Sequence, residues 1–116
     1  MPKILSLHPV DELPAGMTPE EYEQGFAKEI ASFANLPGWK AYLVKADRGE
    51  QVGKFALLVE IESIESRDRY YPRENEESEE GRRFWEEHPD SAAVLEKYAA
   101  FLFTPHRHTD YVVLGT

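Results

Sequence analysis

Three histidines and one aspartate of this 116-residue chain lie at the ends of two short apolar segments. His106, His108 and Asp110 are two residues apart, so an extended backbone would direct their side chains to one face. His8 closes the first apolar segment and joins the group if the two segments pair as strands. Such a cluster could hold zinc, iron or another divalent ion, or act as a general base near neutral pH. The alternative is that these imidazoles are structural groups. We expect no metal, but if one binds, its ligands would be His8, His106, His108 and Asp110.

Aromatic side chains make up 12% of the residues and offer a second kind of chemistry. They could line a pocket for a flat, apolar or quinone-like molecule, or they could pack the core and a dimer interface. An arginine in a predicted turn could contact an anionic substrate, or could be solvated. The candidate substrate-binding residues are Trp39, Tyr70, Trp85 and Arg48. The candidate catalytic residues are His8, His108 and Tyr42.

The composition excludes several classes of protein. The chain has no cysteine, which rules out disulfides, thiol catalysis and thiolate metal sites. Its formal net charge of -9 repels nucleic acids and anionic lipids. No apolar run approaches the ~20 residues of a membrane helix, and the first residues lack the long apolar run of a signal peptide. We therefore expect a cytoplasmic protein that binds neither nucleic acid nor membranes.

Several common catalytic motifs are also missing from the sequence. It contains no phosphate-binding glycine loop, no G-x-S-x-G and no H-E-x-x-H. Nucleotide hydrolysis, serine hydrolysis and zinc-protease chemistry therefore lack support. We expect the protein to work without a cofactor.

The elements that would position these residues begin with a strand and a helix. Residues 3–8 are mostly apolar and precede a proline, which suits a strand that ends where no further backbone donor exists. Thr18-Pro19-Glu20-Glu21 provides an N-cap, a proline at the first helical position and a capping-box glutamate. Apolar residues at helical spacing follow and predict a helix with one face toward a core. They are Tyr22, Phe26, Ile30 and Phe33.

A hairpin, three helical pieces and a last strand account for the rest of the chain. Residues 39–46 and 54–62 favour two strands joined by a turn at Asp47-Arg48-Gly49-Glu50. The second strand is apolar on both faces near its middle, which is typical of a central strand covered on both sides. The expected helices run from Ser63 to Tyr71, Glu79 to Glu87 and Ser91 to about Phe103. The expected last strand runs from His108 to Leu114.

Most of the net charge lies in one stretch. Between Glu60 and Asp90 there are twelve acidic and five basic residues. We interpret residues 72–90 as an acidic helical insertion in a single domain that spans residues 1–116. This insertion is either a solvated surface or a docking surface for a basic partner or a cation.

The order strand, helix, strand, strand, helices, strand is the split βαβ pattern of ferredoxin-like α+β folds. It predicts a four-stranded antiparallel sheet in the order 4-1-3-2 with the helices on one face. The first strand then lies beside the last, which brings His8 next to His106 and His108. The other face needs a cover, and a second copy of the chain would provide one.

Short motifs in this layout resemble those of the dimeric α/β barrel superfamily. They are Leu36-Pro37-Gly38 before a strand and Val59-Glu60-Ile61-Glu62-Ser63 leading into a helix with Arg67 and Tyr70. The superfamily includes antibiotic-biosynthesis monooxygenase-like and stress-responsive A/B-barrel proteins, and the resemblance covers nearly the whole chain. It implies a homodimeric α/β barrel with a pocket between the sheet and its helices, and it assigns no catalytic residue.

Three functions are compatible with these patterns. The first is a small-molecule-binding dimeric α/β barrel that acts as a cofactor-independent monooxygenase or isomerase on an apolar or aromatic substrate, with a histidine or tyrosine moving a proton. The second is a non-catalytic homodimeric module whose acidic helical region binds a protein. The third is a haem-binding or haem-degrading protein with His88, His106 or His108 as axial ligand. An enclosed pocket with converging polar groups favours the first function, and a filled interior favours the second.

Overall fold

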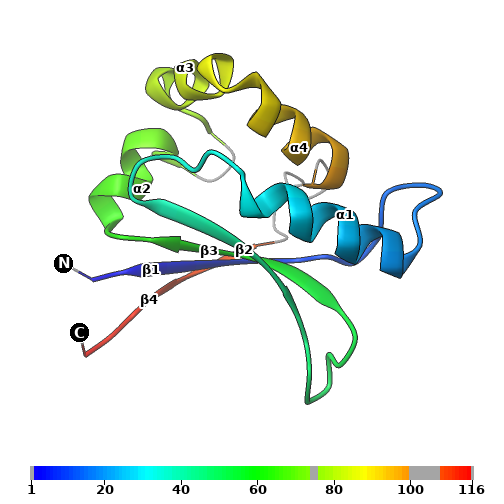
Figure 1. Cartoon of the computed structure of the whole chain (residues 1–116). Helices are drawn as coiled ribbons and strands as arrows, with labels where there is room; N and C mark the ends of the chain where they lie inside the picture. Colours follow the sequence, from blue (N-terminus) through cyan, green and yellow to red (C-terminus); the bar gives the residue numbers. More distant parts are fainter. Residues whose placement is uncertain (1, 74–75, 100–107, 116) are drawn as a thin grey trace.

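The computed structural model describes residues 2–73, 76–99 and 108–115, in which a four-stranded sheet lies beneath four helices (Figure 1). Neighbouring strands are antiparallel, and their order across the sheet is β2-β3-β1-β4. The strands are β1 (Ile4–Pro9), β2 (Trp39–Lys45), β3 (Phe55–Ile61) and β4 (Thr109–Val112). The helices are α1 (Pro19–Ala31), α2 (Ile64–Tyr70), α3 (Glu79–Glu87) and α4 (Pro89–Ala99).

The predicted α+β class, the antiparallel sheet and the strand order are confirmed. Some boundaries differ. α4 begins at Pro89 and not at Ser91, because proline is tolerated in the first turn of a helix. The predicted end of this helix, at about Phe103, lies outside the described residues. Within the part of the chain that the structure describes, no helix is long and apolar enough to cross a membrane.

The first helix begins as its sequence predicts. The Thr18 hydroxyl accepts a hydrogen bond from the Glu21 backbone N–H at 3.2 Å, and the Glu21 carboxylate accepts one from the Thr18 N–H at 3.1 Å. This capping box satisfies two backbone donors that the first turn leaves unpaired. The helix then buries Tyr22 and Phe26 completely against the sheet and α4.

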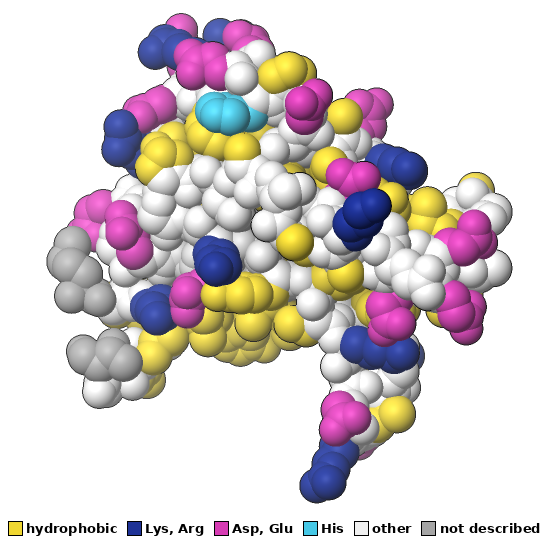
Figure 2. Space-filling model, in the orientation of Figure 1, with side chains coloured by type: hydrophobic (Ala, Val, Ile, Leu, Met, Phe, Trp, Pro, Cys, Tyr) yellow, Lys and Arg dark blue, Asp and Glu magenta, His cyan; other side chains and the backbone are white. Residues whose placement is uncertain are grey.

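The central strand β3 shows how the sheet divides into two faces. Phe55, Leu57, Val59 and Ile61 are buried toward the helices, and the alternate residues Ala56 and Leu58 are only partly buried. All four helices lie on the first face, which we call the covered face (Figure 1). We call the other the open face. Hydrophobic side chains gather on the open side of the sheet (Figure 2).

The acidic stretch predicted at residues 72–90 contains α3 and the start of α4. Several of its charges pair with one another at the surface, as Arg82 does with Glu79 and Glu86. Exposed ion pairs of this kind contribute little stability. α3 is fixed instead by its aromatic residues, and Trp85 packs against Phe33 with ring centroids 5.8 Å apart.

Candidate functional site

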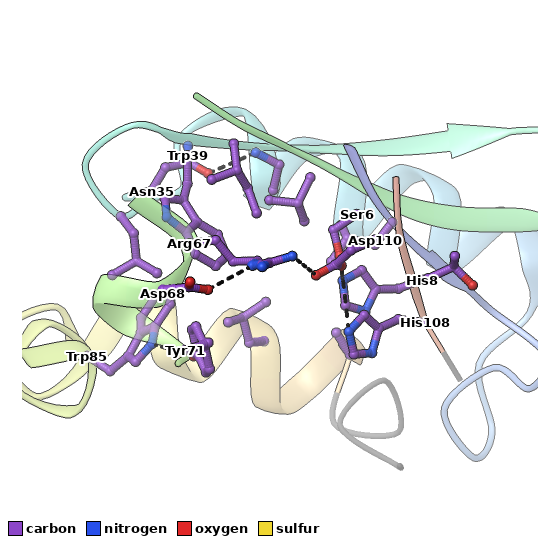
Figure 3. A pocket seen from close by; sticks show the side chains of 18 of the residues that line it. Ser6, His8, Asn35, Trp39, Arg67, Asp68, Tyr71, Trp85, His108 and Asp110 are labelled. Carbon is purple, nitrogen blue, oxygen red and sulfur yellow. Dashed lines mark hydrogen bonds and ion pairs between the residues drawn. The ribbon is translucent and has the colours of Figure 1, made fainter. Parts of the chain in front are cut away.

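A cavity of about 550 Å³ lies between the helices and the covered face of the sheet (Figure 3). Every strand contributes to its wall, as do the segment between α1 and β2 and the helices α2, α3 and α4. Most of the lining is apolar. Aromatic side chains gather at one end with Asn35 and Asp68, and a cluster of Ser6, His8, His108 and Asp110 lies at the other (Figure 3). Volumes of several hundred cubic ångströms are typical of small-molecule sites.

The aromatic end is built from Trp39, Tyr71 and Trp85 (Figure 3). The Trp39 indole N–H donates to the Ser66 carbonyl at 3.1 Å, and the Trp85 indole N–H donates to the Tyr71 hydroxyl at 3.1 Å. The Tyr71 hydroxyl in turn donates to the Glu77 carboxylate at 3.2 Å. Burial raises the pKa of Tyr71 to about 12, so its hydroxyl keeps its proton at neutral pH. The polar atoms of these rings are therefore engaged by the protein, and this end offers mainly ring surface.

The segment between α1 and β2 is held to the cavity by two hydrogen bonds from its polar groups. The Asn35 side-chain oxygen accepts from the Ala41 backbone N–H at 2.9 Å. The Ala34 backbone N–H donates to the hydroxyl of Ser91, a buried residue of α4, at 2.8 Å. These bonds tie the segment to β2 on one side and to the helix layer on the other.

The polar end of the cavity is formed by Ser6 and His8 of β1 with His108 and Asp110 at β4 (Figure 3). Ser6 lies opposite Asp110 in the strand register, so the two side chains share a face. The Ser6 hydroxyl is 2.6 Å from Asp110 Oδ1 and 3.0 Å from His8 Nε2. The imidazole rings of His8 and His108 stack, with centroids 4.8 Å apart.

Arg67 connects this polar end to the helix layer. Its side chain extends from α2 toward β4, and Nη1 donates to Asp110 Oδ2 at 3.2 Å (Figure 3). Its Nε donates to Asp68 Oδ1 at 3.1 Å. Asp110 is thus held by the Arg67 guanidinium on one oxygen and by the Ser6 hydroxyl on the other.

His8 has the most perturbed environment in this cluster. Burial, reinforced by the neighbouring His108, lowers the pKa of His8 to about 4, although the Asp110 carboxylate opposes the shift. The imidazole is therefore neutral at pH 7. Its Nδ1 atom is buried and has no hydrogen-bond partner among the described residues, which is uncommon for a buried polar atom. His8 lines the cavity, and its shifted pKa and unpartnered ring nitrogen make it a candidate functional group.

The structure brings some of the predicted site residues together. The predicted cluster members His8, His108 and Asp110 meet at the polar end, and the predicted substrate contacts Trp39 and Trp85 line the same cavity. His106 lies outside the described residues.

Three other candidates lie elsewhere. Tyr42 lies opposite Leu58 on the open face and is 39% exposed. Arg48 lies in the exposed hairpin turn and does not line the cavity. Tyr70 is buried beside Trp39, with ring centroids 6.3 Å apart, and its neighbour Tyr71 lines the cavity in its place.

The sequence interpretation missed Ser6 and Arg67 as site residues. Ser6 could have been found, because it lies two residues before His8 on one strand and so shares its face. Arg67 carried no such signal, since only the packing of α2 over the sheet brings it to Asp110.

No group of three or more histidine, aspartate or glutamate side chains within residues 2–73, 76–99 and 108–115 is arranged to hold a metal ion. The Asp110 oxygens are instead engaged by Ser6 and Arg67. His88, a candidate haem ligand, does not line the cavity, and its Nδ1 lies 2.8 Å from the Phe84 carbonyl.

Comparisons of the chain with protein-family models, with curated proteins and with solved structures found no match. The function is therefore argued from the chemistry of the cavity.

Proposed function

We propose that this protein binds a small, flat, largely apolar molecule in the cavity and removes an acidic proton from it, with His8 as the general base. The observation that carries this proposal is that His8 lines a cavity of about 550 Å³ and has a buried Nδ1 with no hydrogen-bond partner in the described part of the chain. An interaction module with a filled interior would need neither the cavity nor the converging polar groups.

The basicity of His8 limits the kind of proton that it removes. With a pKa of about 4, the imidazole is unprotonated at neutral pH and ready to accept a proton, but it is a weak base. It therefore suits a hydrogen whose removal leaves a delocalised anion, such as a phenolic O–H or a C–H beside a carbonyl. The proton moves to Nδ1, and the electron pair of the broken bond stays on the substrate. Return of the proton to another carbon completes an isomerisation.

The tryptophans offer a direct test of binding. The chain has two tryptophans, and both line the cavity. A ligand that enters the cavity is expected to change the intrinsic fluorescence, and aromatic ketones and phenols are the compounds to screen first. If no compound of these classes changes the fluorescence or the melting temperature, the binding part of the proposal is wrong.

Proton transfer is tested with aromatic ketones, by exchange of a carbon-bound hydrogen beside the carbonyl for deuterium in D₂O. His8→Ala is expected to lower the exchange rate by about 10²–10⁴-fold, the usual contribution of a general base. His88→Ala is the matched control, because His88 does not line the cavity. Equal rates in the two variants would contradict the role of His8. Oxygen uptake in the same samples separates a cofactor-independent monooxygenase from an isomerase.

We also propose that two copies of the chain pair through their open faces, in the ferredoxin-like dimeric α/β barrel arrangement that the sequence resembles. This pairing is supported by the apolar side chains on the open side of the sheet (Figure 2). Tyr42 and Tyr111 are 39% and 54% exposed. Around these side chains, Lys3 and Glu60 form an ion pair at 3.1 Å. Exposed apolar patches rimmed by polar groups commonly mark protein interfaces.

Light scattering on a sizing column tests this pairing. The wild-type protein is expected at twice the 13.3 kDa chain mass, and Tyr42→Glu is expected to shift it to the mass of one chain. Val52→Glu is the control, because Val52 is 57% exposed near the tip of the β2–β3 hairpin. A wild-type protein that elutes as a single chain at high concentration would contradict the pairing.

A further inference from the structure

We propose that Ser6 and Asp110 are positioning residues that fix His8 in the tautomer with its hydrogen on Nε2, which leaves Nδ1 as the nitrogen that takes a proton. The catalytic use of this tautomer rests on the proposed function, but the tautomer itself does not.

The number of hydrogens shared by Ser6, His8 and Asp110 determines the tautomer. The Ser6 hydroxyl has a single hydrogen and contacts two partners, Asp110 Oδ1 at 2.6 Å and His8 Nε2 at 3.0 Å. The Asp110 carboxylate, paired with the Arg67 guanidinium, has no hydrogen to give. The Ser6 hydrogen therefore goes to Asp110, and the hydrogen of the second contact must come from His8 Nε2. A neutral imidazole has only one N–H, so Nδ1 has none.

The opposite tautomer would leave a repulsive contact. If His8 had its hydrogen on Nδ1, the Ser6 hydroxyl would have to donate to Nε2. The Ser6 oxygen and Asp110 Oδ1 would then lie 2.6 Å apart with no hydrogen between them. A contact that short is favourable only as an O–H···O⁻ hydrogen bond.

Arg67 fixes which way the Asp110 side chain is turned. Its Nη1 donates to Oδ2 at 3.2 Å, so the atom of residue 110 that faces Arg67 must be a hydrogen-bond acceptor. This requirement predicts the effect of Asp110→Asn. The amide oxygen would occupy the position beside Arg67, and the amide NH₂ would face Ser6. Ser6 would then accept from the amide and donate its own hydrogen to His8 Nε2, which moves the imidazole hydrogen to Nδ1.

The test is the tautomer of His8 measured by long-range ¹H–¹⁵N NMR of ¹⁵N-labelled protein at pH 7. In the wild type we expect the hydrogen on Nε2. His88 is an internal reference of the opposite kind, because its Nδ1 lies 2.8 Å from the Phe84 carbonyl, which can only accept. Asp110→Asn is expected to reverse the His8 tautomer. Ser6→Ala, which removes the hydroxyl, is expected to lower the share of the Nε2–H form.

Asp68→Asn is the matched control. Asp68 also pairs with Arg67 and lines the cavity, but its pair is with Nε, and no hydrogen bond joins it to Ser6. It should leave the His8 tautomer unchanged. A wild-type His8 with its hydrogen on Nδ1, or an Asp110→Asn protein that folds and keeps the wild-type tautomer, would overturn the proposal. If Asp110→Asn does not fold, an unchanged tautomer in Ser6→Ala would overturn it.

The two proposals fail in different ways. If the tautomers are as expected but no ligand exchanges its hydrogen for deuterium, the positioning role stands and the proposed function is contradicted. Deuterium exchange that depends on His8, in a protein whose His8 hydrogen is on Nδ1, would contradict the positioning role and leave His8 as a general base that acts through Nε2.

Discussion

The two faces of the sheet are made by alternate residues of the same strands, yet they differ in chemistry. On the covered face, β1 contributes Ser6 and His8, which take part in a network of hydrogen bonds and stacked rings. On the open face, the same strand contributes Leu5 and Leu7, which lie opposite Glu60 and Leu58 of β3. A shift of one residue along β1 thus leads from a polar, hydrogen-bonded face to one that carries leucines.

The helices do more than cover the sheet. On the covered face they stand far enough from β1 and β4 to leave a cavity, and α2 supplies the arginine that reaches across it. The His8 and Asp110 side chains are partly buried there, which strengthens their hydrogen bonds relative to those in water. Substitutions on the covered face should therefore change stability more than substitutions on the open face.

The largest effect is expected from the core beneath α1. Phe26 is fully buried, and its ring stacks on Tyr98 with centroids 4.9 Å apart. Phe26→Ala should lower the free energy of unfolding by about 3–5 kcal/mol, because it removes buried apolar surface and leaves a cavity. Urea denaturation measures this change. A loss under about 1 kcal/mol would mean that α1 does not pack on the covered face as described.

The pH dependence of stability tests the burial of His8. The unfolded chain binds a proton at this histidine below pH 6.5, and the folded protein does so only below about pH 4. Between these values the unfolded state holds more protons, so stability falls as the pH drops through this window. The loss should reach about 3 kcal/mol at pH 4, and the full stability should be present above pH 6.5.

Carboxylates titrate in the same pH range, so the contribution of His8 is the difference between wild type and His8→Gln. The two proteins should lose unequal stability in urea denaturation between pH 7 and pH 4, with the larger loss in the wild type. Equal losses would show that His8 is not buried in its neutral form.

A smaller effect is expected where α1 meets α4. A Cβ atom at Gly25 would lie 2.7 Å from the Tyr98 hydroxyl oxygen. Glycine to alanine usually stabilises a helix by about 1 kcal/mol, but here the close contact should reverse the sign and cost about 1–2 kcal/mol. Thermal and urea denaturation would measure it. Adding Tyr98→Phe removes the nearest atom and should recover stability, and no recovery would place the strain elsewhere.

The smallest effect is expected on the open face. Tyr111 is 54% exposed, so Tyr111→Ser should change the unfolding free energy of the single chain by no more than about 0.5 kcal/mol. If two copies pair through this face, the same substitution should destabilise the protein only at concentrations where pairs form. Denaturation at two protein concentrations, with light scattering on the same samples, separates these effects. A large loss in dilute, unpaired protein would contradict the exposed position of Tyr111.

Much of the fold could be predicted from local sequence signals. The capping box at Thr18 placed the start of α1, and α3 spans the expected residues Glu79–Glu87. The alternation in β3 identified a central strand, and the element order gave the strand order. These features depend on residues close together in sequence, and backbone capping and side-chain periodicity act at that range.

The candidate site was predictable only in part. Strand pairing was enough to bring His8 to His108 and Asp110, because neighbouring strands and a period of two place side chains on a common face. The same period places Tyr42 on the open face, opposite Leu58. To place Tyr42, one must know which set of alternate residues in β2 faces the helices. Both sets contain apolar residues, so the sequence of β2 did not show which set this is.

The elements, their order and the meeting of imidazoles and a carboxylate on neighbouring strands are encoded in local sequence patterns. The contact of Arg67 with Asp110, 43 residues away in the chain, and the place of Ser6 between Asp110 and His8 depend on the packing of the whole chain. Local hydrogen bonding and periodicity act over a few residues and leave their mark on the sequence. The distance between a helix and a sheet depends on how all the side chains between them pack, and no short segment encodes that packing.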